Sequence, residues 1–446
     1  MKLEIPWQCQ EILDRFKEHG VQAYLVGGCV RDQLLGRKPN DWDICTEALP
    51  DQVREIFKDY KVILTGLQHG TVTVLLNSMP VEITTYRIDG EYEDNRHPKE
   101  VFFTDSLQED LSRRDFTINA MAYHPDVGVV DYFGGMEDLK KGIVRCVGEA
   151  ACRYQEDGLR ILRAIRFACV LHFQFEEETE KAISDYNYLL KNIAKERIQV
   201  EFDKIITSSW AAYGLELLVK LHCMEYIIPE LCHTWEFDQR GGRHQYDVFM
   251  HSVKAVSYIF PSVPLRLTML LHDIGKPFVW QPESDRDLFP DHGRVGAELA
   301  GKILNRMRYD KKTIAKVKTL IGEHERPLQP NPVCVRHAVR ELGEEGLRDL
   351  LEVKRADIRA HGEGKWLEVL KIFDAIEDSL DGVIKRGECC SLKELAVSGK
   401  DMVSLGFRGK EVGEVLNNLL EEVLQEPDKN NREYLLQEAQ EWSRDL

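Results

Sequence analysis

The spacing of apolar and polar positions changes along the chain and divides it into a β-containing first part and a helical remainder. Residues 9–20 repeat apolar side chains at helical spacing, and residues 21–37 (VQAYLVGGCVRDQLLGR) fit an apolar strand, a Gly-Gly turn and a helix beginning near Val30. Three runs rich in β-branched residues follow, namely DWDICT, TVTVLL and VEITTYR. The pattern predicts a small mixed β-sheet with helices, followed by a polar loop over 89–106.

From about residue 146 onward, strand signals nearly vanish. The stretch EDGLRILRAIRFACVL, residues 156–171, begins a long helical region in which apolar residues recur at spacings of three and four. Glycine and charged residues interrupt this pattern near 238–245 and 361–366. We therefore predict an α+β protein, with a mixed-sheet head followed by an all-α region, divided into 1–145, 146–237, 238–362 and 363–446.

Composition narrows the class of protein without identifying it. The 446 residues carry a formal net charge of -17, which argues against nonspecific nucleic-acid binding but is compatible with a local basic groove. The eleven cysteines are an odd number and include no C-x-x-C pair, as is typical of a reduced protein. The chain starts without a signal-peptide pattern and contains no apolar run long enough to cross a bilayer. We expect a soluble, cytoplasmic protein without a membrane partner.

Two aspartates in the predicted strand DWDICT are the first candidates for chemistry. Asp41 and Asp43 are two residues apart, so both carboxylates would point to one face of a strand and would repel unless a cation lies between them. Gly28 and Arg31 precede them in GGCVRD, and Arg114 follows in SRRDFTINAMA. Nucleotidyl transfer uses such a set: carboxylates for divalent metals, a glycine turn for phosphate and arginines for charge. An Asp-x-Asp pair alone is more often a turn or a helix cap.

A third carboxylate is predicted at Glu82, in VEITTYR. If its strand lies beside the Asp pair, Glu82 would help to hold a metal or to orient an attacking hydroxyl. The competing interpretation is an ordinary surface residue. Trp42, between the two aspartates, would point to the opposite face of the strand and belong to the core.

Three motifs resemble those of the class II tRNA nucleotidyltransferase and poly(A) polymerase family: LVGGCVRDQLLGRKPNDWDICT, RRDFTINAMA and EDGLRILRAIRFA. The likeness runs through almost the whole chain. It implies a template-independent enzyme whose partners are tRNA, CTP and ATP and which builds the CCA end of tRNA. It also implies that Gly28 and Arg31 bind the triphosphate and that Asp41 and Asp43 hold two Mg²⁺ ions.

The same resemblance assigns the choice of the incoming base to an EDxxR motif, matched by Glu156, Asp157 and Arg160. An aspartate accepts from an amino group and an arginine donates to a ring nitrogen or carbonyl, so the pair suits the edges of C and A. At positions i and i+3 of one helix, the two side chains would share a face. An i,i+3 salt bridge on a solvated helix is the competing interpretation. The resemblance adds further nucleotide-binding arginines, namely Arg114, Arg163 and Arg166.

The polar loop contains RHP at 96–98, which resembles the flexible loop that family members use to reshape the pocket between C and A addition. Members that add only C tend to lack it, so the loop favours full CCA addition or A addition. A terminal-A-adding enzyme or a poly(A) polymerase is the alternative within the class, because the motifs are largely shared.

The middle of the chain carries a second set of polar residues, in HQYDVFMHSVKAV, LLHDIGKP, DHGRVGAELA, GEHERP and KRADIRAH. Their order resembles the H…HD…D order of the HD phosphohydrolase superfamily, with His251, His272, Asp273 and Asp357 as the matching residues. His292 and His324 occur where two-metal members place extra ligands. Nitrogen and carboxylate ligands suit a divalent transition metal better than magnesium. The resemblance implies an HD domain over 238–362 that hydrolyses phosphate esters.

The same likeness implies a nucleotidyltransferase head over 1–145, a neck over 146–237 and a tRNA-binding tail over 363–446, with a helix beginning near Lys410. For the tail, the competing interpretation is an ordinary helix-turn-helix packing unit. A function of another class stays open, namely an HD phosphohydrolase with a nucleotide-binding regulatory domain. A non-enzymatic tRNA-binding module fits less well, since such a module needs no paired metal carboxylates and the chain is acidic.

Overall fold

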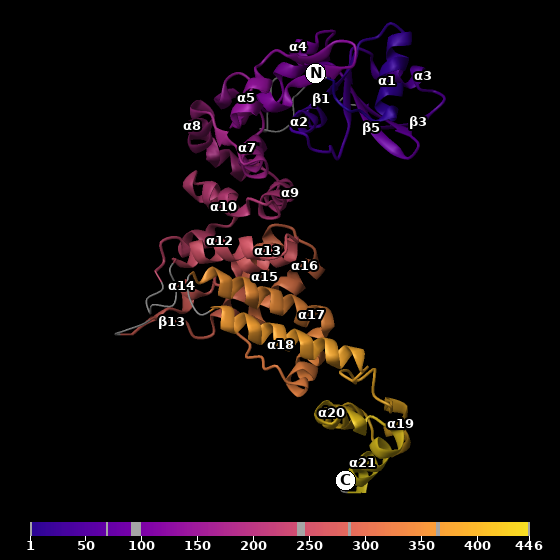
Figure 1. The fold of residues 1–446 in the computed structure, drawn as a ribbon, viewed down its shortest axis with the longest axis vertical. Coiled ribbons are helices and arrows are strands. Elements are labelled where there is room, and N and C mark those ends of the chain that lie inside the picture. Colours follow the sequence, from indigo (N-terminus) through magenta and orange to yellow (C-terminus); the bar gives the residue numbers. More distant parts are fainter. Residues whose placement is uncertain are drawn as a thin grey trace. The chain divides into compact units, whose positions relative to one another are not determined.

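The computed structural model describes residues 2–67, 70–90, 100–238, 246–283, 287–362 and 366–444. The chain folds into two compact units, Met1–Cys232 and His233–Leu446. Strands concentrate in the first half of the first unit and helices follow (Figure 1), which confirms the predicted α+β class. No helix in the described part of the chain combines the length and the apolar character that a membrane span requires.

A seven-stranded mixed sheet forms the centre of the head, in the order β3-β4-β5-β2-β1-β8-β9. Only β2 and β5 are parallel neighbours, and the other pairs in this sheet are antiparallel. The three runs rich in β-branched residues all become strands of this sheet. Their bounds, with those of the other members, are β1 Ala23–Val26, β2 Asp43–Thr46, β3 Lys61–Gly66, β4 Thr71–Leu76, β5 Met79–Thr85, β8 Met121–His124 and β9 Gly128–Asp131.

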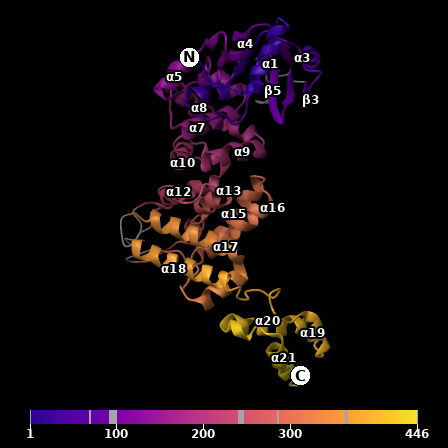
Figure 2. The ribbon, with the colours of Figure 1, turned by 45° about the vertical axis from the view of Figure 1, so that its right-hand side comes forward.

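Helices α1 (Trp7–Glu18) and α3 (Pro50–Ile56) lie beside the sheet in both views (Figures 1 and 2). The apolar stripe of α1 is fully buried, as its helical spacing predicts. Helix α2 (Gly28–Leu34) begins two residues before the predicted start at Val30. Gly27 caps it with φ of 77°, a conformation that favours glycine, so the Gly-Gly turn has a backbone reason.

The polar stretch 89–106 is only partly a loop. Strand β6 (Arg87–Asp89) pairs antiparallel with β7 (Val101–Phe103), so the ends of the stretch form a small two-stranded sheet. Helix α4 (Leu107–Ser112) follows, with Ser106 accepting a hydrogen bond from the Glu109 amide as its N-cap. The RHP motif at 96–98 lies outside the described residues.

The neck consists of helices, but the stretch 156–171 is not one helix. Helix α6 (Ala150–Glu156) ends at Asp157, whose backbone is extended with φ of -139° and ψ of 103°, and α7 (Leu159–Leu171) begins two residues later. A side chain on Gly158 would meet Leu189 at 3.0 Å, so close packing at the break excludes larger residues. The neck continues through α8 (Glu177–Tyr186), α9 (Lys195–Ile206) and α10 (Ala211–Lys220).

In the second unit, α17 (Pro332–Ala360) packs along α18 (Trp366–Lys385), and α12 (Val248–Tyr258) packs on α13 (Val263–Leu271) and α17, as Figures 1 and 2 show. Helices α15 (His292–Arg306) and α16 (Lys311–Glu323) complete this group. The tail contains α19 (Gly399–Ser404), α20 (Lys410–Gln425) and α21 (Arg432–Arg444) around a small apolar core. Helix α20 begins at the predicted residue.

Candidate functional site

Two cavities meet at Asp43 in the first unit. One has a volume of about 450 Å³, and we name it the arginine cavity because seven arginines line it: Arg31, Arg113, Arg114, Arg160, Arg163, Arg166 and Arg197. The other has a volume of about 740 Å³, and we name it the aspartate cavity because Asp41 and Asp43 line it. The two share Gly28, Arg31, Asp43, Arg166 and Phe167. Most sequence-predicted residues of the head and neck therefore surround one connected site.

The predicted carboxylate pair lies at the start of β2. Asp43 is the first residue of the strand and Asp41 precedes it, so the strand begins two residues later than predicted. Burial raises the pKa of Asp43 to about 6, with the nearby negative charge of Glu82 acting in the same direction and Arg114 opposing it. A cation between these oxygens would remove that unfavourable charge, and an all-oxygen donor set suits Mg²⁺.

Glu82 lies on β5 directly across from Asp43 in the parallel register. The condition set from the sequence, that its strand lies beside the Asp pair, is met. Its side chain is exposed and lines neither cavity. The geometry therefore brings the third carboxylate next to the pair without placing it on the cavity wall.

Buried carboxylates hold the arginines in place. Arg113 and Arg114 form ion pairs with the buried Asp110 at 2.7 and 3.3 Å. Arg163 donates hydrogen bonds to Asp115, and although burial raises the pKa of Asp115, the positive charge of Arg163 holds it well below its usual range. These pairs fix the guanidinium groups before any ligand arrives, which is the preorganisation that anion binding needs.

Phe167 organises three further contacts at the point where the cavities meet. The guanidinium carbons of Arg166, Arg31 and Arg163 lie 4.1, 4.9 and 5.6 Å from the centre of its ring. Cation–π attraction between guanidinium and ring stabilises this cluster of like charges. Arg31 also donates to the Asn119 side chain at 2.6 Å. Phe167 and Asn119 line the candidate site and were not identified from the sequence.

The helix breaks at Asp157, so the helix face predicted to be shared by Asp157 and Arg160 is not formed, and the competing i,i+3 salt bridge between them does not form either. Asp157 instead accepts two hydrogen bonds from Arg197 at 3.3 and 2.7 Å. Arg160 pairs with Glu156 at 2.6 Å and donates to the Arg113 carbonyl at 2.9 Å. Both side chains still line the arginine cavity, so the two residues share a site without sharing a helix face.

Arg197 is the most consequential residue that the sequence analysis overlooked. It lies on α9, forty positions from Asp157, and lines the arginine cavity with it. The local sequence around Arg197 is that of an ordinary solvent-exposed helix and does not indicate that this arginine lines a cavity. Only the packing of α9 on α7 brings it to the site.

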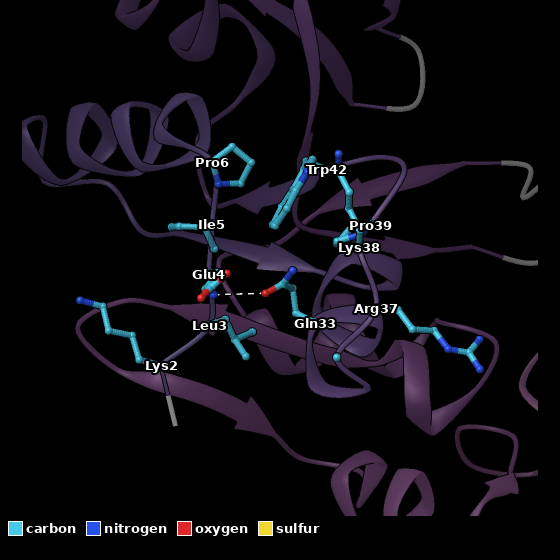
Figure 3. A pocket seen from close by; sticks show the side chains of 11 residues that line it. Lys2, Leu3, Glu4, Ile5, Pro6, Gln33, Arg37, Lys38, Pro39 and Trp42 are labelled. Atoms are coloured by element: carbon cyan, nitrogen blue, oxygen red, sulfur yellow. Dashed lines mark hydrogen bonds between the residues drawn. The ribbon is translucent and has the colours of Figure 1, made fainter.

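A separate cavity of about 670 Å³ lies behind the Asp41 segment, between the N-terminal residues and the loop after α2. Trp42 is 9% exposed, and Figure 3 shows its indole facing Ile5 and Pro6. The Glu4 amide donates to the Gln33 side chain at 3.1 Å (Figure 3), which ties the N-terminal segment to α2. Trp42 is thus buried against the head, as expected for a core residue.

In the second unit, all six predicted ligands of the HD pattern converge. His251 on α12, His272 and Asp273 after α13, and Asp357 on α17 approach one another, with Nε2 of His251 2.9 Å from Asp357 and Nε2 of His272 3.3 Å from Asp273. Nε2 of His292 lies 3.3 Å from the other oxygen of Asp273, and Nε2 of His324 lies 3.9 Å from it. We name these six residues together with His361 the HD cluster.

His361 belongs to the cluster but was missed from the sequence. Its ring stacks on that of His251 with centres 5.1 Å apart, and its Nε2 lies 3.7 Å from Asp357. A signal for it did exist, since His361 follows Asp357 by four residues and therefore lies on the same helix face.

Hydrogen bonds orient three of the histidines toward a common centre. Nδ1 of His272, His292 and His324 each contacts a backbone carbonyl, of Met269, Phe289 and Ile321, at 2.8, 2.9 and 2.7 Å. A carbonyl only accepts, so each Nδ1 carries a proton and each Nε2 is directed inward. Nε2 of His292 and of His324 then face each other at 3.2 Å, an arrangement that a cation between them would stabilise.

The electrostatics of the cluster agree with a cation site. Burial lowers the pKa of His324 to about 4, which keeps it neutral and able to bind a metal. Burial also opposes protonation of His272, but the carboxylates of Asp273 and Asp357 raise its pKa to about 10. Lys276 adds a salt bridge to Asp273 at 2.6 Å. The histidine nitrogens and carboxylate oxygens of each group lie within 4.8 Å of one another, a spacing that fits a divalent metal.

Three family models match the chain. Residues 23–145 match "Poly A polymerase head domain", residues 172–234 match "Probable RNA and SrmB- binding site of polymerase A", and residues 248–360 match "HD domain". The HD match spans the HD cluster up to Asp357, and the head match spans both aspartates of the pair.

Known proteins resemble the chain over its whole length. The CCA-adding enzyme of Bacillus cytotoxicus is 34% identical over 428 residues, which cover 95% of each chain. The crystal structure of Bacillus stearothermophilus CCA-adding enzyme in complex with CTP is 28% identical, with a TM-score of 0.75 over 99% of each chain. The Thermotoga maritima CCA-adding enzyme complexed with tRNA is 20% identical, with a TM-score of 0.56 over 98% of this chain and 95% of that chain, and it shares the fold.

Proposed function

The chain belongs to the family of CCA-adding enzymes, and we therefore propose that it extends the 3′ end of tRNA with C, C and A from CTP and ATP. The observation that carries the proposal is the meeting of two cavities at Asp43, one of them lined by arginines. Transfer of a nucleotide brings two substrates to one reactive centre, and a triphosphate matches the arginine cavity in charge. A relative of known structure holds CTP, which supports a nucleotide at this site.

Each substrate contact is proposed from the charges around Asp43. Gly27 and Gly28 would let the triphosphate approach the start of α2, and Arg31 and Arg114 would neutralise its oxygens. Asp41 and Asp43 would hold Mg²⁺, which when bound supplies Lewis-acid stabilisation of the attacking and leaving oxygens. The 3′-hydroxyl of the RNA would then face the α-phosphate from the side of the aspartate cavity, with pyrophosphate leaving toward the arginines.

For the choice of base, we propose Asp157 and Arg160 as the reading groups and Arg197 as the residue that positions Asp157. Asp157 lies in the break between α6 and α7, where its Oδ1 accepts a hydrogen bond from the Leu159 amide at 3.1 Å, and two hydrogen bonds from Arg197 orient the carboxylate further. Arg160 is held by Glu156 in the same way. Arg163 and Arg166 are proposed to contribute positive charge to the nucleotide site.

Arg197→Ala should lower the discrimination of CTP and ATP against GTP and UTP by about ten- to a hundredfold. Loss of hydrogen bonds to a charged group is worth about 1.5–3 kcal/mol, and here it releases the orientation of Asp157. The measurement is kcat/KM for each nucleotide on one tRNA transcript. Arg54→Ala, which alters an exposed surface pair with Asp51, is the matched control. If the ratios of kcat/KM for CTP and ATP to those for GTP and UTP were unchanged, Arg197 would have no part in the selection of the base.

Glu82 is proposed to support Asp43 as the third carboxylate. Glu82→Gln keeps the size of the side chain and removes the charge that faces Asp43 across the parallel pair. We expect kcat for addition to fall about tenfold, less than the roughly hundredfold or more of a group that transfers a proton itself, because Glu82 lines neither cavity. Steady-state kinetics at saturating tRNA and CTP measures it, and an unaltered kcat would favour the surface-residue interpretation.

A second candidate function rests on the HD cluster. We propose that it binds a divalent transition metal and hydrolyses a phosphate ester, because histidine and carboxylate ligands converge there with their Nε2 atoms directed inward. A metal-activated water is the expected nucleophile in such sites. A chain whose main activity is this hydrolysis is disfavoured, since a regulatory nucleotide sensor needs no carboxylate pair beside its arginines.

We also propose that the head, neck, HD domain and tail divide at residues 145, 237 and 362, that the tail contacts tRNA, and that the protein is cytoplasmic. Full CCA addition is proposed over addition of the terminal A alone, and the RHP stretch on which that preference depends lies outside the described residues.

Nucleotide binding by titration tests the proposed transferase site. We expect nonhydrolysable CTP and ATP to bind, GTP to bind poorly, and Arg160→Ala to weaken binding of both preferred nucleotides about tenfold or more, by loss of one charged hydrogen-bonding group. Equal binding of all four nucleotides, independent of Arg160, would contradict the proposal.

A further inference from the structure

The aspartate cavity has a second wall that the proposed nucleotide site does not use. Across from Asp41 and Asp43, the cavity is lined by the end of α9 and the turn before α10, residues 204 and 207–210. The loop after α2 supplies Arg37 and Lys38 to the same cavity. Because the proposed triphosphate site lies on the arginine side of Asp43, this larger cavity is available for the other reactant.

Trp210 is the unusual feature of this wall. It is 47% exposed and lines a cavity whose other lining residues on this wall are polar. The His172 ring stacks on the indole with ring centres 3.6 Å apart and an angle of 2° between the planes. Tyr213 contacts the edge of His172 in turn, at 5.7 Å. The indole is therefore fixed from behind before any ligand arrives.

Polar and positive groups surround the exposed part of this indole. Lys204 is half exposed, and hydroxyls come from Thr207, Ser208 and Ser209. Arg37 donates to the Val170 carbonyl at 3.4 Å, which holds the loop with Lys38 against α7. An aromatic plane beside lysines and hydroxyls is the combination that single-stranded nucleic acid requires, with stacking for the base and positive charge for the backbone.

We propose that the aspartate cavity binds the 3′ end of the acceptor RNA and that its terminal base stacks on Trp210, with Lys204 and Lys38 facing the backbone phosphates. This inference rests on the proposed function. It also meets a requirement of that function: the terminal base of the acceptor changes as the end grows, and every base has a face that can stack. A site that recognised one base edge by hydrogen bonds would reject the others.

The test uses a hairpin RNA of the acceptor stem with 2-aminopurine as its 3′-terminal base, titrated with the full-length enzyme. The fluorescence of this base is quenched when it stacks. We expect quenching with the wild-type enzyme, loss of the quench with Trp210→Ala, and RNA binding weakened about tenfold, in the range of one stacked base. Trp210→Phe should restore most of both. Trp7→Ala, which removes an exposed tryptophan of α1 that lines none of the three cavities, is the matched control.

Binding of CTP is measured on the same variants and is expected to stay unchanged in Trp210→Ala. Unchanged CTP binding would show that the substitution removes a contact with the acceptor RNA and does not damage the whole site. A quench and an RNA affinity in Trp210→Ala equal to those of the wild type would overturn the proposal, as would an equal loss of CTP binding. Nucleotide addition by the wild-type enzyme is followed in parallel. If the wild-type enzyme adds no nucleotide, the proposed function fails; if it adds nucleotides but the terminal base does not stack on Trp210, only this inference fails.

Discussion

Asp43→Asn is expected to abolish nucleotide addition, with kcat reduced about a thousandfold or more. The substitution keeps the size of the side chain but removes the charge at the only residue of the carboxylate pair that lines both cavities. A metal clamp on the transition-state charge is worth several kcal/mol, and each 1.36 kcal/mol is about tenfold in rate. The measurement is single-turnover incorporation of labelled CMP into a tRNA transcript that lacks CCA.

Binding of the nucleotide should be affected much less, because Arg31 and Arg114, which are proposed to neutralise the triphosphate, are held by Asn119 and Asp110 and not by Asp43. Asp185→Asn, at an exposed position of α8 that lines neither cavity, is the matched control and should behave as the wild type. If Asp43→Asn extends tRNA at the wild-type rate, the carboxylate pair does not carry the transfer.

Asp273→Asn is expected to empty the HD cluster of metal and to abolish any hydrolysis of phosphate esters. Asp273 contacts His272 and His292 through its two oxygens, so it is the ligand that joins the two halves of the cluster. Metal bound per chain, measured by mass spectrometry after purification without chelator, should fall to background. Nucleotide addition should stay within about twofold, since the cluster and Asp43 lie in different compact units.

Removing one partner of a buried ion pair costs about 3–5 kcal/mol, so Asp273→Asn carries a risk of unfolding the second unit. Asp357→Asn, whose side chain is 24% exposed, is the second variant, and Asp381→Asn, on the exposed face of α18, is the control. Full metal content in both folded variants would show that the cluster is not a metal site.

The sequence predicted those parts of the structure that local pattern determines. Alternating β-branched residues marked β2, β4 and β5, and the Gly-Gly turn marked the start of α2, because each depends on neighbours in the chain. The family resemblance is confirmed by the match to relatives along the whole chain, and the six residues it predicted as HD ligands converge in the structure.

Other parts depend on packing between distant segments and left no local signal. The apolar spacing of 156–171 continues through Asp157, yet the helix breaks there, with Asp157 extended and Gly158 close to Leu189. The prediction that Asp157 and Arg160 share a helix face is wrong because of this break. Arg197 and Trp210 reach their cavities only through the packing of the neck helices. The pairing of β6 with β7 likewise joins residues on both sides of a polar stretch.

The most direct test of the central claim is nucleotide addition to three tRNA transcripts, ending before CCA, after the first C and after CC, with CTP alone, ATP alone and both. The account predicts that all three transcripts are extended to CCA when both nucleotides are present, that CTP alone stops the first two after CC, and that Asp43→Asn adds nothing. Extension of only the CC-ended transcript, or addition that continues in Asp43→Asn, would contradict it.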